Sequence, residues 1–211
     1  MIACMLAAVS AVVLITMIVM SRLYASAIAD YGFAQGDVGK AMAQFADTRS
    51  AMRGIIGYDD MDVVNTLLQN HKTYKDNFTR DFENLEAYMI TDENMKVYND
   101  IKDRLDDYWK LEDEIITQGA TIDITQSRAA QDRAVNELMP VYDEIYDQLT
   151  QIMDIKVDEG QTVSNVLAIV IIILTVIIVI IIGIAIAFAI SLGKGIANSI
   201  AVPLDQIMQR L

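Results

Sequence analysis

The fold of this chain is decided by residues 165–192, NVLAIVIIILTVIIVIIIGIAIAFAISL. The stretch contains no charged residue, and it is longer than the ~20 apolar residues that a helix needs to cross a bilayer. Its isoleucine and valine content would favour a β-strand in water. In lipid, however, a single segment must pair all its backbone N–H and C=O groups internally, so it must be helical. We therefore predict a transmembrane helix over residues 163–192.

A second uncharged stretch, MIACMLAAVSAVVLITMIVMS, opens the chain. It also has the length of a membrane span, and Arg22 and Tyr24 follow it as an interfacial pair that anchors a helix end. A cleaved signal peptide is the alternative, because Ala25–Ala27 offers small residues for cleavage. No basic segment precedes the apolar run, so we favour a first transmembrane helix over residues 1–22.

The region between the two apolar stretches is acidic. The whole chain has 211 residues and a net charge of −13, and residues 23–162 hold 13 basic and 28 acidic residues, a net charge of −15. This charge argues against a nucleic-acid partner, which requires a basic surface. The single cysteine, Cys4, lies in the first apolar stretch, which excludes an intramolecular disulfide and a thiolate metal site.

Apolar residues in the acidic region recur at intervals of three and four, the spacing of an amphipathic helix. The pattern predicts helices over Tyr31–Tyr58, Asp60–Met89 and about Thr91–Gln118, and a fourth helix that begins near Asp123 or Thr125. Thr91 is the expected N-cap of the third helix. Four such stripes predict an all-α fold, an antiparallel four-helix bundle over residues 23–162 that is continuous with the two membrane helices.

The fourth helix has the clearest repeat of the four. Its predicted buried residues follow a heptad pattern: Val135, Leu138, Tyr142, Ile145, Leu149 and Ile152. Pro140 lies inside this pattern and should kink the helix, because proline removes a backbone donor and clashes with the preceding turn. No turn cluster follows Ile152, so we expect an unbroken helix through Gly160 into the second membrane helix.

Residues 193–211 are amphipathic again. Their apolar side chains recur on one side of a helix, at Ile196, Ile200, Leu204, Ile207, Met208 and Leu211, and Pro203 stands near its start. Lys194 lies directly after the second span and favours a cytoplasmic C-terminus.

The order of these segments resembles the methyl-accepting chemotaxis receptors of bacteria. The string YGFAQGDVGKAMAQFADTRSAMRGIIGYDD is similar to the first helix of their four-helix-bundle sensor domain, and AVNELMPVYDEIYDQLTQIMDI, with Pro140, is similar to the fourth. The string SIAVPLDQIMQRL resembles the first helix of a HAMP linker, with Pro203 and Leu204 as its Pro-Leu pair. The resemblance assigns signal transmission to Pro140, Gly160, Pro203 and Leu204.

The resemblance also implies a location and partners. It implies an inner or plasma membrane protein with two spans, an extracytoplasmic sensor domain and cytoplasmic termini. It further implies a homodimer in the lipid bilayer. The dimer would hold a small molecule, for example a carboxylate, between its subunits near the membrane-distal part of the first helices, or would bind a solute-binding protein. The output would pass through a cytoplasmic region to a coupling protein and a histidine kinase.

The candidate ligand-binding residues are Arg49, Arg53 and Thr48. Arg49 matches the first ligand-binding arginine of the family's enteric amino-acid receptors, and Arg53 matches more loosely because its spacing differs. A guanidinium group suits a carboxylate because it can donate two parallel hydrogen bonds, and the Thr48 hydroxyl could add a donor. The alternative is that both arginines form weak surface ion pairs with the domain's many acids.

Other chemistry finds little support in the sequence. His71, the only histidine, lies on a helical stripe and is expected to be a core or interface histidine. No Glu-x-x-His pair, phosphate-binding loop or nucleophile with its base is present, so we expect neither a cofactor nor an enzyme. Two other functions stay open: the sensor region of a histidine kinase, and a membrane-anchored structural or adaptor bundle without a ligand.

Overall fold

The structure, a computed structural model, describes residues 2–208, with the backbone alone for residues 2–6, 8 and 200–208. The described residues are helical and contain no strand, which confirms the predicted all-α fold. The chain divides into two compact units. One comprises Met1–Ser26 and Val163–Leu211, and the other comprises Ala27–Thr162.

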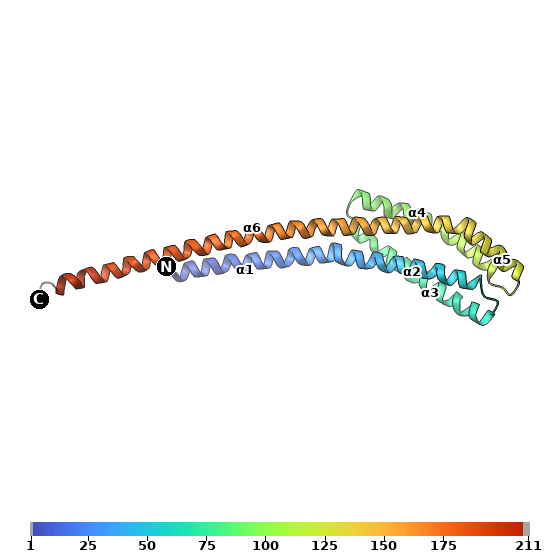
Figure 1. The fold of residues 1–211 in the computed structure, drawn as a ribbon, viewed down its shortest axis with the longest axis horizontal. Helices are drawn as coiled ribbons and strands as arrows, with labels where there is room; N and C mark the ends of the chain where they lie inside the picture. The colour runs from blue at the N-terminus through green and yellow to red at the C-terminus, as the bar shows by residue number, and fades with distance from the viewer. Residues whose placement is uncertain (1, 209–211) are drawn as a thin grey trace. The chain divides into compact units, whose positions relative to one another are not determined.

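The first unit contains the two apolar stretches. It is built from most of α1 (Ile2–Ala27) and from the C-terminal part of α6 (Met139–Met208) (Figure 1). Both helices are long and apolar enough to cross a membrane. Many of their large apolar side chains are exposed, as at Leu14 and Ile172. An exposed apolar surface of this extent is typical of a site of membrane or protein contact.

The second unit is an antiparallel four-helix bundle (Figure 1). Its first helix is a π-helical turn, η1 (Ile28–Phe33), followed by α2 (Ala34–Ile55), and its second is α3 (Met61–Leu85), extended by η2 (Glu86–Tyr88). The third is α4 (Asp92–Gly119). The fourth is built from α5 (Ile124–Arg133), the π-helical turn η3 (Ala134–Leu138) and the start of α6.

Aromatic side chains from all four helices meet in the core. Phe45 of α2 stacks on Tyr142 of α6, with ring centroids 4.7 Å apart, and lies 5.0 Å from Phe78 of α3 and 5.1 Å from Tyr108 of α4. All four side chains are buried. Aromatic pairs of this kind add roughly 0.5–1.5 kcal/mol beyond the burial of their area. The cluster therefore packs the four helices of the bundle against one another through Phe45.

Polar caps set the starts of three helices. The Thr91 hydroxyl accepts from the Asn94 N–H at 3.3 Å and confirms the predicted cap of α4. Asp60 and Asp123 do the same for α3 and α5, accepting backbone N–H groups of the first turn. Each cap of this kind stabilises a helix by about 1 kcal/mol.

Two glycines allow close approach of the chain at one end of the bundle. Gly57 follows α2, and its φ is not positive. A Cβ at Gly57 would lie 2.8 Å from the Arg53 carbonyl oxygen, so the backbone itself leaves no room for a side chain there. Gly119 ends α4, where a Cβ would lie 2.5 Å from Ile56 Cγ2 and 2.7 Å from Ala130 Cβ. A larger residue at Gly119 would therefore push apart the ends of α2, α4 and α5.

The opposite end of the bundle contains a buried charge. Lys156 of α6 is fully buried, and its ammonium lies 2.8 Å from a carboxylate oxygen of Glu159. The Asn94 amide of α4 donates to the other oxygen of Glu159 at 2.9 Å, and the Gln35 amide of α2 donates to the Lys156 carbonyl at 3.1 Å. These contacts connect three helices, and we call this region the Lys156 end.

Candidate ligand pocket

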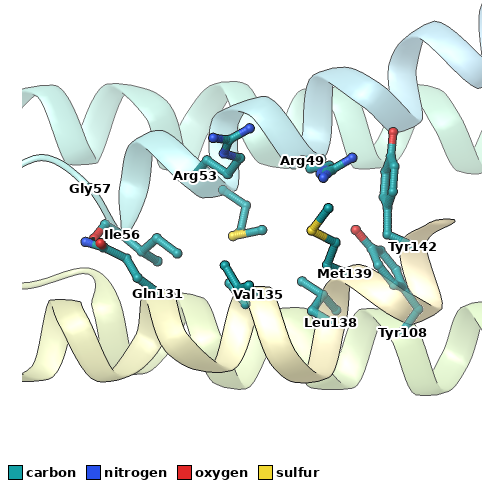
Figure 2. A pocket seen from close by; sticks show the side chains of 12 residues that line it. Arg49, Arg53, Ile56, Gly57, Tyr108, Gln131, Val135, Leu138, Met139 and Tyr142 are labelled. Carbon is teal, nitrogen blue, oxygen red and sulfur yellow. Dashed lines mark hydrogen bonds between the residues drawn. The ribbon is translucent and has the colours of Figure 1, made fainter.

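A pocket of about 350 Å³ lies between the C-terminal half of α2 and the fourth helix, where α5, η3 and α6 meet (Figure 2). Most of its lining comes from these two sides, and Tyr108 of α4 closes it from within. We call this part of the bundle the pocket end. The lining residues are Arg49, Met52, Arg53, Ile56, Gly57, Tyr108, Gln131, Ala134, Val135, Leu138, Met139 and Tyr142.

Two arginines of α2 stand on the wall of this pocket. Arg49 and Arg53 are one helical turn apart, so their side chains share a face of α2, and Figure 2 shows both on the α2 side of the pocket. A second hollow of about 290 Å³ is lined by Ala46 and Ser50 together with Arg49, Arg53 and Tyr142. The arginines therefore lie between two open spaces.

The surroundings of the two guanidinium groups differ. The Cζ atom of Arg49 lies 4.3 Å from the centroid of the Tyr142 ring, and its Nη1 atom is 3.8 Å from a carboxylate oxygen of Asp143. The ring contact holds the guanidinium in place by a cation–π interaction, whereas the distance to Asp143 is long for a hydrogen bond. Arg53 is exposed and forms no ion pair or hydrogen bond with any side chain that the structure describes.

A π-helical turn shapes the opposite wall. The Met139 N–H donates to the Ala134 carbonyl, five residues back, so the turn is wider than an α-helical one. The turn ends at Leu138, two residues before Pro140, whose missing N–H and ring would disturb an α-helical turn. The kink predicted at Pro140 is therefore taken up as a π-helical turn, and Val135, Leu138 and Met139 of this region line the pocket.

The wider turn corrects one predicted core residue. Val135, expected in the buried heptad pattern, is 61% exposed. The buried positions are instead Ala130, Ala134, Leu138 and Tyr142, at successive intervals of four. Intervals of four suit a turn that holds more than 3.6 residues, and Val135, one residue further on, faces the pocket.

A chain of buried polar groups runs inward from the pocket. The Tyr108 hydroxyl donates to one oxygen of Glu112 at 3.2 Å, and the other oxygen lies 3.0 Å from His71 Nε2 of α3. That last contact has an ion-pair distance but lacks the angles of a hydrogen bond. Glu112 is fully buried and His71 is 5% exposed, so His71 is the expected core histidine.

Two tyrosines of the pocket have raised pKa values. Burial is the main cause for Tyr108, and the neighbouring Glu112 carboxylate raises the pKa of the phenol further. Burial also raises the pKa of Tyr142, although the Arg49 guanidinium beside it acts in the opposite direction. Both hydroxyls therefore stay neutral to higher pH than free tyrosine, and they add no negative charge to the pocket.

Thr48, the third predicted ligand-binding residue, does not reach the pocket. It is fully buried, and its hydroxyl donates to the Phe45 carbonyl at 2.7 Å. One residue of an α-helix corresponds to a rotation of roughly 100°, so Thr48 faces the core while its neighbour Arg49 faces the pocket.

The four residues assigned to signal transmission lie along α6. Pro140 follows the π-helical turn. Gly160 lies where the first helix comes close, since a Cβ there would be 3.2 Å from Gln35 Nε2 and 3.4 Å from Tyr31 Cβ. Pro203 and Leu204 lie in the helical backbone of α6, and their side chains are outside the described part of the chain.

Several residues of the pocket were not recognised from the sequence. Tyr142 was expected only as a core residue of the heptad pattern, and no ligand-binding role was assigned to Tyr108 or Gln131. The succession of intervals of four before Pro140 is the pattern that could have indicated a widened turn. For metal binding, the described residues contain no group of three or more histidine, cysteine, aspartate or glutamate side chains that could hold an ion.

The chain matches a known protein family over most of its length. Residues 2–169 match the model of a family described as the four helix bundle sensory module for signal transduction. No curated protein and no solved structure gives a significant match. The matched residues cover the first membrane-type helix, all four helices of the bundle and the pocket. The chain therefore belongs to this family of four-helix-bundle sensory modules, of the kind that methyl-accepting chemotaxis proteins use for signal transduction.

Proposed function

We propose that this chain is the sensor region of a transmembrane chemoreceptor and that it detects a small extracellular solute in the pocket between α2 and the fourth helix. The bundle lies outside the cytoplasm, and α1 and α6 cross the inner or plasma membrane with both termini inside the cell. The observation that carries the proposal is that α6 helps to line the pocket and is a single helix from Met139 to Met208.

The mechanism needs only a small movement of α6. A solute shifts the balance between two helix arrangements by no more than its difference in affinity for them. Helix shifts of roughly 1–2 Å are common in such switches. Leu138, Met139 and Tyr142 on the pocket wall belong to η3 and α6. A bound solute that favours one packing of these side chains therefore favours one position of α6, which a HAMP-like helix containing Pro203 and Leu204 would receive.

The working unit in this proposal is a homodimer. One side of α2 is exposed along its length, at Gly36, Lys40, Ala43, Asp47 and Ser50. These positions alternate by four and three, the spacing of a helix face that packs against another helix. The exposed face of α2 in one subunit would pack against the same face of its partner.

Disulfide crosslinking in membranes tests the dimer. In a background in which Cys4 is replaced by serine, we expect Ala43→Cys to crosslink within the dimer. Thr79→Cys, at an exposed position of α3, is the matched control and should crosslink far less. Equal and slow crosslinking of the two variants would contradict the dimer.

A solute screen tests the sensing role. Solutes that bind the folded chain in lipid nanodiscs raise its unfolding midpoint, and they should also change the crosslinking rate of cysteines near Gly160. A solute that binds at the pocket without changing this rate would remove the support for transmission through α6. If no solute of any class raised the midpoint, the sensing role itself would be wrong.

A further inference from the structure

The charge of the pocket is opposite to that of the domain around it. Residues 23–162 carry 28 acidic and 13 basic residues. Within the described part of the chain, the residues that line the pocket and the adjoining hollow nevertheless include Arg49 and Arg53 and no aspartate or glutamate. Two guanidinium groups on the wall of a partly enclosed space attract an anion, and they favour a carboxylate because they can donate paired hydrogen bonds to it.

The rest of the lining is mostly apolar. Six apolar side chains from the two sides form this part of the wall: Met52, Ile56, Ala134, Val135, Leu138 and Met139. Gln131 is polar, but its amide nitrogen already donates to the Ile56 carbonyl at 2.9 Å and to the Ser127 hydroxyl at 3.0 Å. A space of about 350 Å³ with such walls suits a hydrocarbon chain or ring that is removed from water.

None of the described residues that line the pocket would neutralise an ammonium. Asp143, near Arg49, is outside the lining and 53% exposed at its side chain. Glu112 is fully buried behind Tyr108, from which it accepts a hydrogen bond. An amino acid that bound here would place its ammonium beside two guanidinium groups and lose part of its hydration without an ionic partner, which is unfavourable.

We infer that the ligand is a carboxylate with a hydrocarbon chain or ring and without an amino group. Arg53, which has no partner among the described side chains, and Arg49, held over Tyr142, bind the carboxylate. The apolar wall formed by α2 and η3 holds the hydrocarbon part. This inference rests on the proposed function, because it names the class of solute that the same pocket receives.

Matched probes test the inference. Calorimetric titration of the full chain in nanodiscs, against empty nanodiscs, would compare hexanoate with norleucine, which adds an ammonium, with acetate, which lacks the chain, and with hexylamine, which reverses the charge. We expect hexanoate to bind about tenfold or more tightly than each of the other three. Benzoate should bind like hexanoate.

Two variants show whether hexanoate occupies this pocket. Arg53→Gln removes the exposed guanidinium and should weaken hexanoate binding about tenfold or more. Arg128→Gln removes the same charge from α5 outside the pocket, and it should leave hexanoate binding unchanged. Circular dichroism would check that both variants are folded.

Each other result overturns the inference. Norleucine binding as tightly as hexanoate would exclude the assigned class of ligand and leave the sensing role intact. The same conclusion would follow if another solute in the screen bound while hexanoate and benzoate did not. Equal hexanoate binding by the Arg53→Gln variant and the unchanged chain would place the probe elsewhere. The sensing role fails separately, only when no solute of any class binds.

Discussion

The two ends of the bundle use positive charge in opposite ways. At the Lys156 end, the lysine is fully buried and its ammonium lies 2.8 Å from Glu159, which also accepts a hydrogen bond from Asn94. At the pocket end, Arg53 is exposed at a hollow, and the nearest carboxylate to Arg49 is 3.8 Å away. A charge that is fully matched within the fold has a structural role, whereas a charge left at an open space is available to a ligand.

Both ends nevertheless share one feature of the backbone. A π-helical turn lies at each, η1 in the first helix near the Lys156 end and η3 in the fourth helix at the pocket. At the Lys156 end little space remains beside the turn, because a Cβ added at Gly160 would lie 3.2 Å from Gln35 Nε2 and 3.4 Å from Tyr31 Cβ. At the pocket end the space beside the turn stays open. The Lys156 end therefore has a structural role, whereas the pocket end keeps an open space for the binding that we propose.

The largest loss of stability is expected when the Glu159 carboxylate is removed from the Lys156 end. Glu159→Ala leaves the ammonium of Lys156 buried without a partner, and we expect it to destabilise the chain by about 3 kcal/mol. Arg53→Gln, the corresponding change at the pocket end, should alter stability by no more than about 0.5 kcal/mol. Urea unfolding in detergent measures both. Similar losses for the two variants would abolish the distinction between the ends.

A second test adds one methyl group at each end. Gly119→Ala places a Cβ 2.5 Å from Ile56 Cγ2 and should cost about 2 kcal/mol through overpacking. Gly160→Ala meets the Gln35 amide at 3.2 Å, a flexible side chain that can move, so about 1 kcal/mol is expected. The same unfolding assay applies. A larger loss at Gly160 than at Gly119 would show that the Lys156 end is the more tightly packed.

A third test uses alkaline pH and concerns the pocket end. Burial holds the Tyr108 pKa above its usual value of 10.0 in the folded chain. The contribution of the neutral Tyr108 phenol to the free energy of unfolding is fully present below pH 10. It is lost as the pH rises further, because Tyr108 then releases its proton in the unfolded chain but keeps it in the folded chain. The loss amounts to about 1.4 kcal/mol for each pH unit.

The variant Tyr108→Phe isolates this effect. It should be less stable at neutral pH by about 1 kcal/mol, since Glu112 loses a hydrogen bond. Between pH 10 and 11.5 its stability should fall less steeply than that of the unchanged chain, as measured by urea unfolding at each pH. Parallel curves for the two proteins would exclude a buried neutral phenol at this position.

The smallest expected effect sharpens the role of Arg49. Asp143→Asn removes the carboxylate that lies 3.8 Å from Arg49. Because the pair is partly exposed, its loss should change stability by less than about 1 kcal/mol. Removing a competing anion should nevertheless tighten hexanoate binding about threefold. Unchanged or weaker binding in the titration would show that Asp143 does not compete for the guanidinium.

Local patterns in the sequence predicted much of the fold. Thr91 and Asp123 cap helices because a side chain and backbone two or three residues away suffice to form the cap. Arg49 and Arg53 share a face of α2 because helical spacing alone determines this. Thr48 illustrates the limit, since a polar residue next to Arg49 was grouped with it although the rotation of the helix turns it into the core.

Features that depend on distant residues could not be predicted in the same way. The burial of Lys156 depends on Glu159 and on Asn94, which lies 65 residues before Glu159. The chain of contacts from Tyr108 to Glu112 and His71 joins two helices. Val135 was wrongly predicted to be buried, because the wider turn contains an extra residue. Residues before the turn therefore face a different direction from the one that the heptad pattern after it predicts.

The π-helical turn also links the length of the fourth helix to its proline. Deleting one residue from Ala134–Leu138 would convert the turn to ordinary α-helix and leave the residues on either side facing the core. Pro140 would then stand in an α-helical interior at a cost of ~3 kcal/mol. A deletion anywhere else before Ile152 would instead rotate part of the helix by roughly 100°. Relatives that lack the extra residue should therefore lack the proline too, and each change alone should be poorly tolerated.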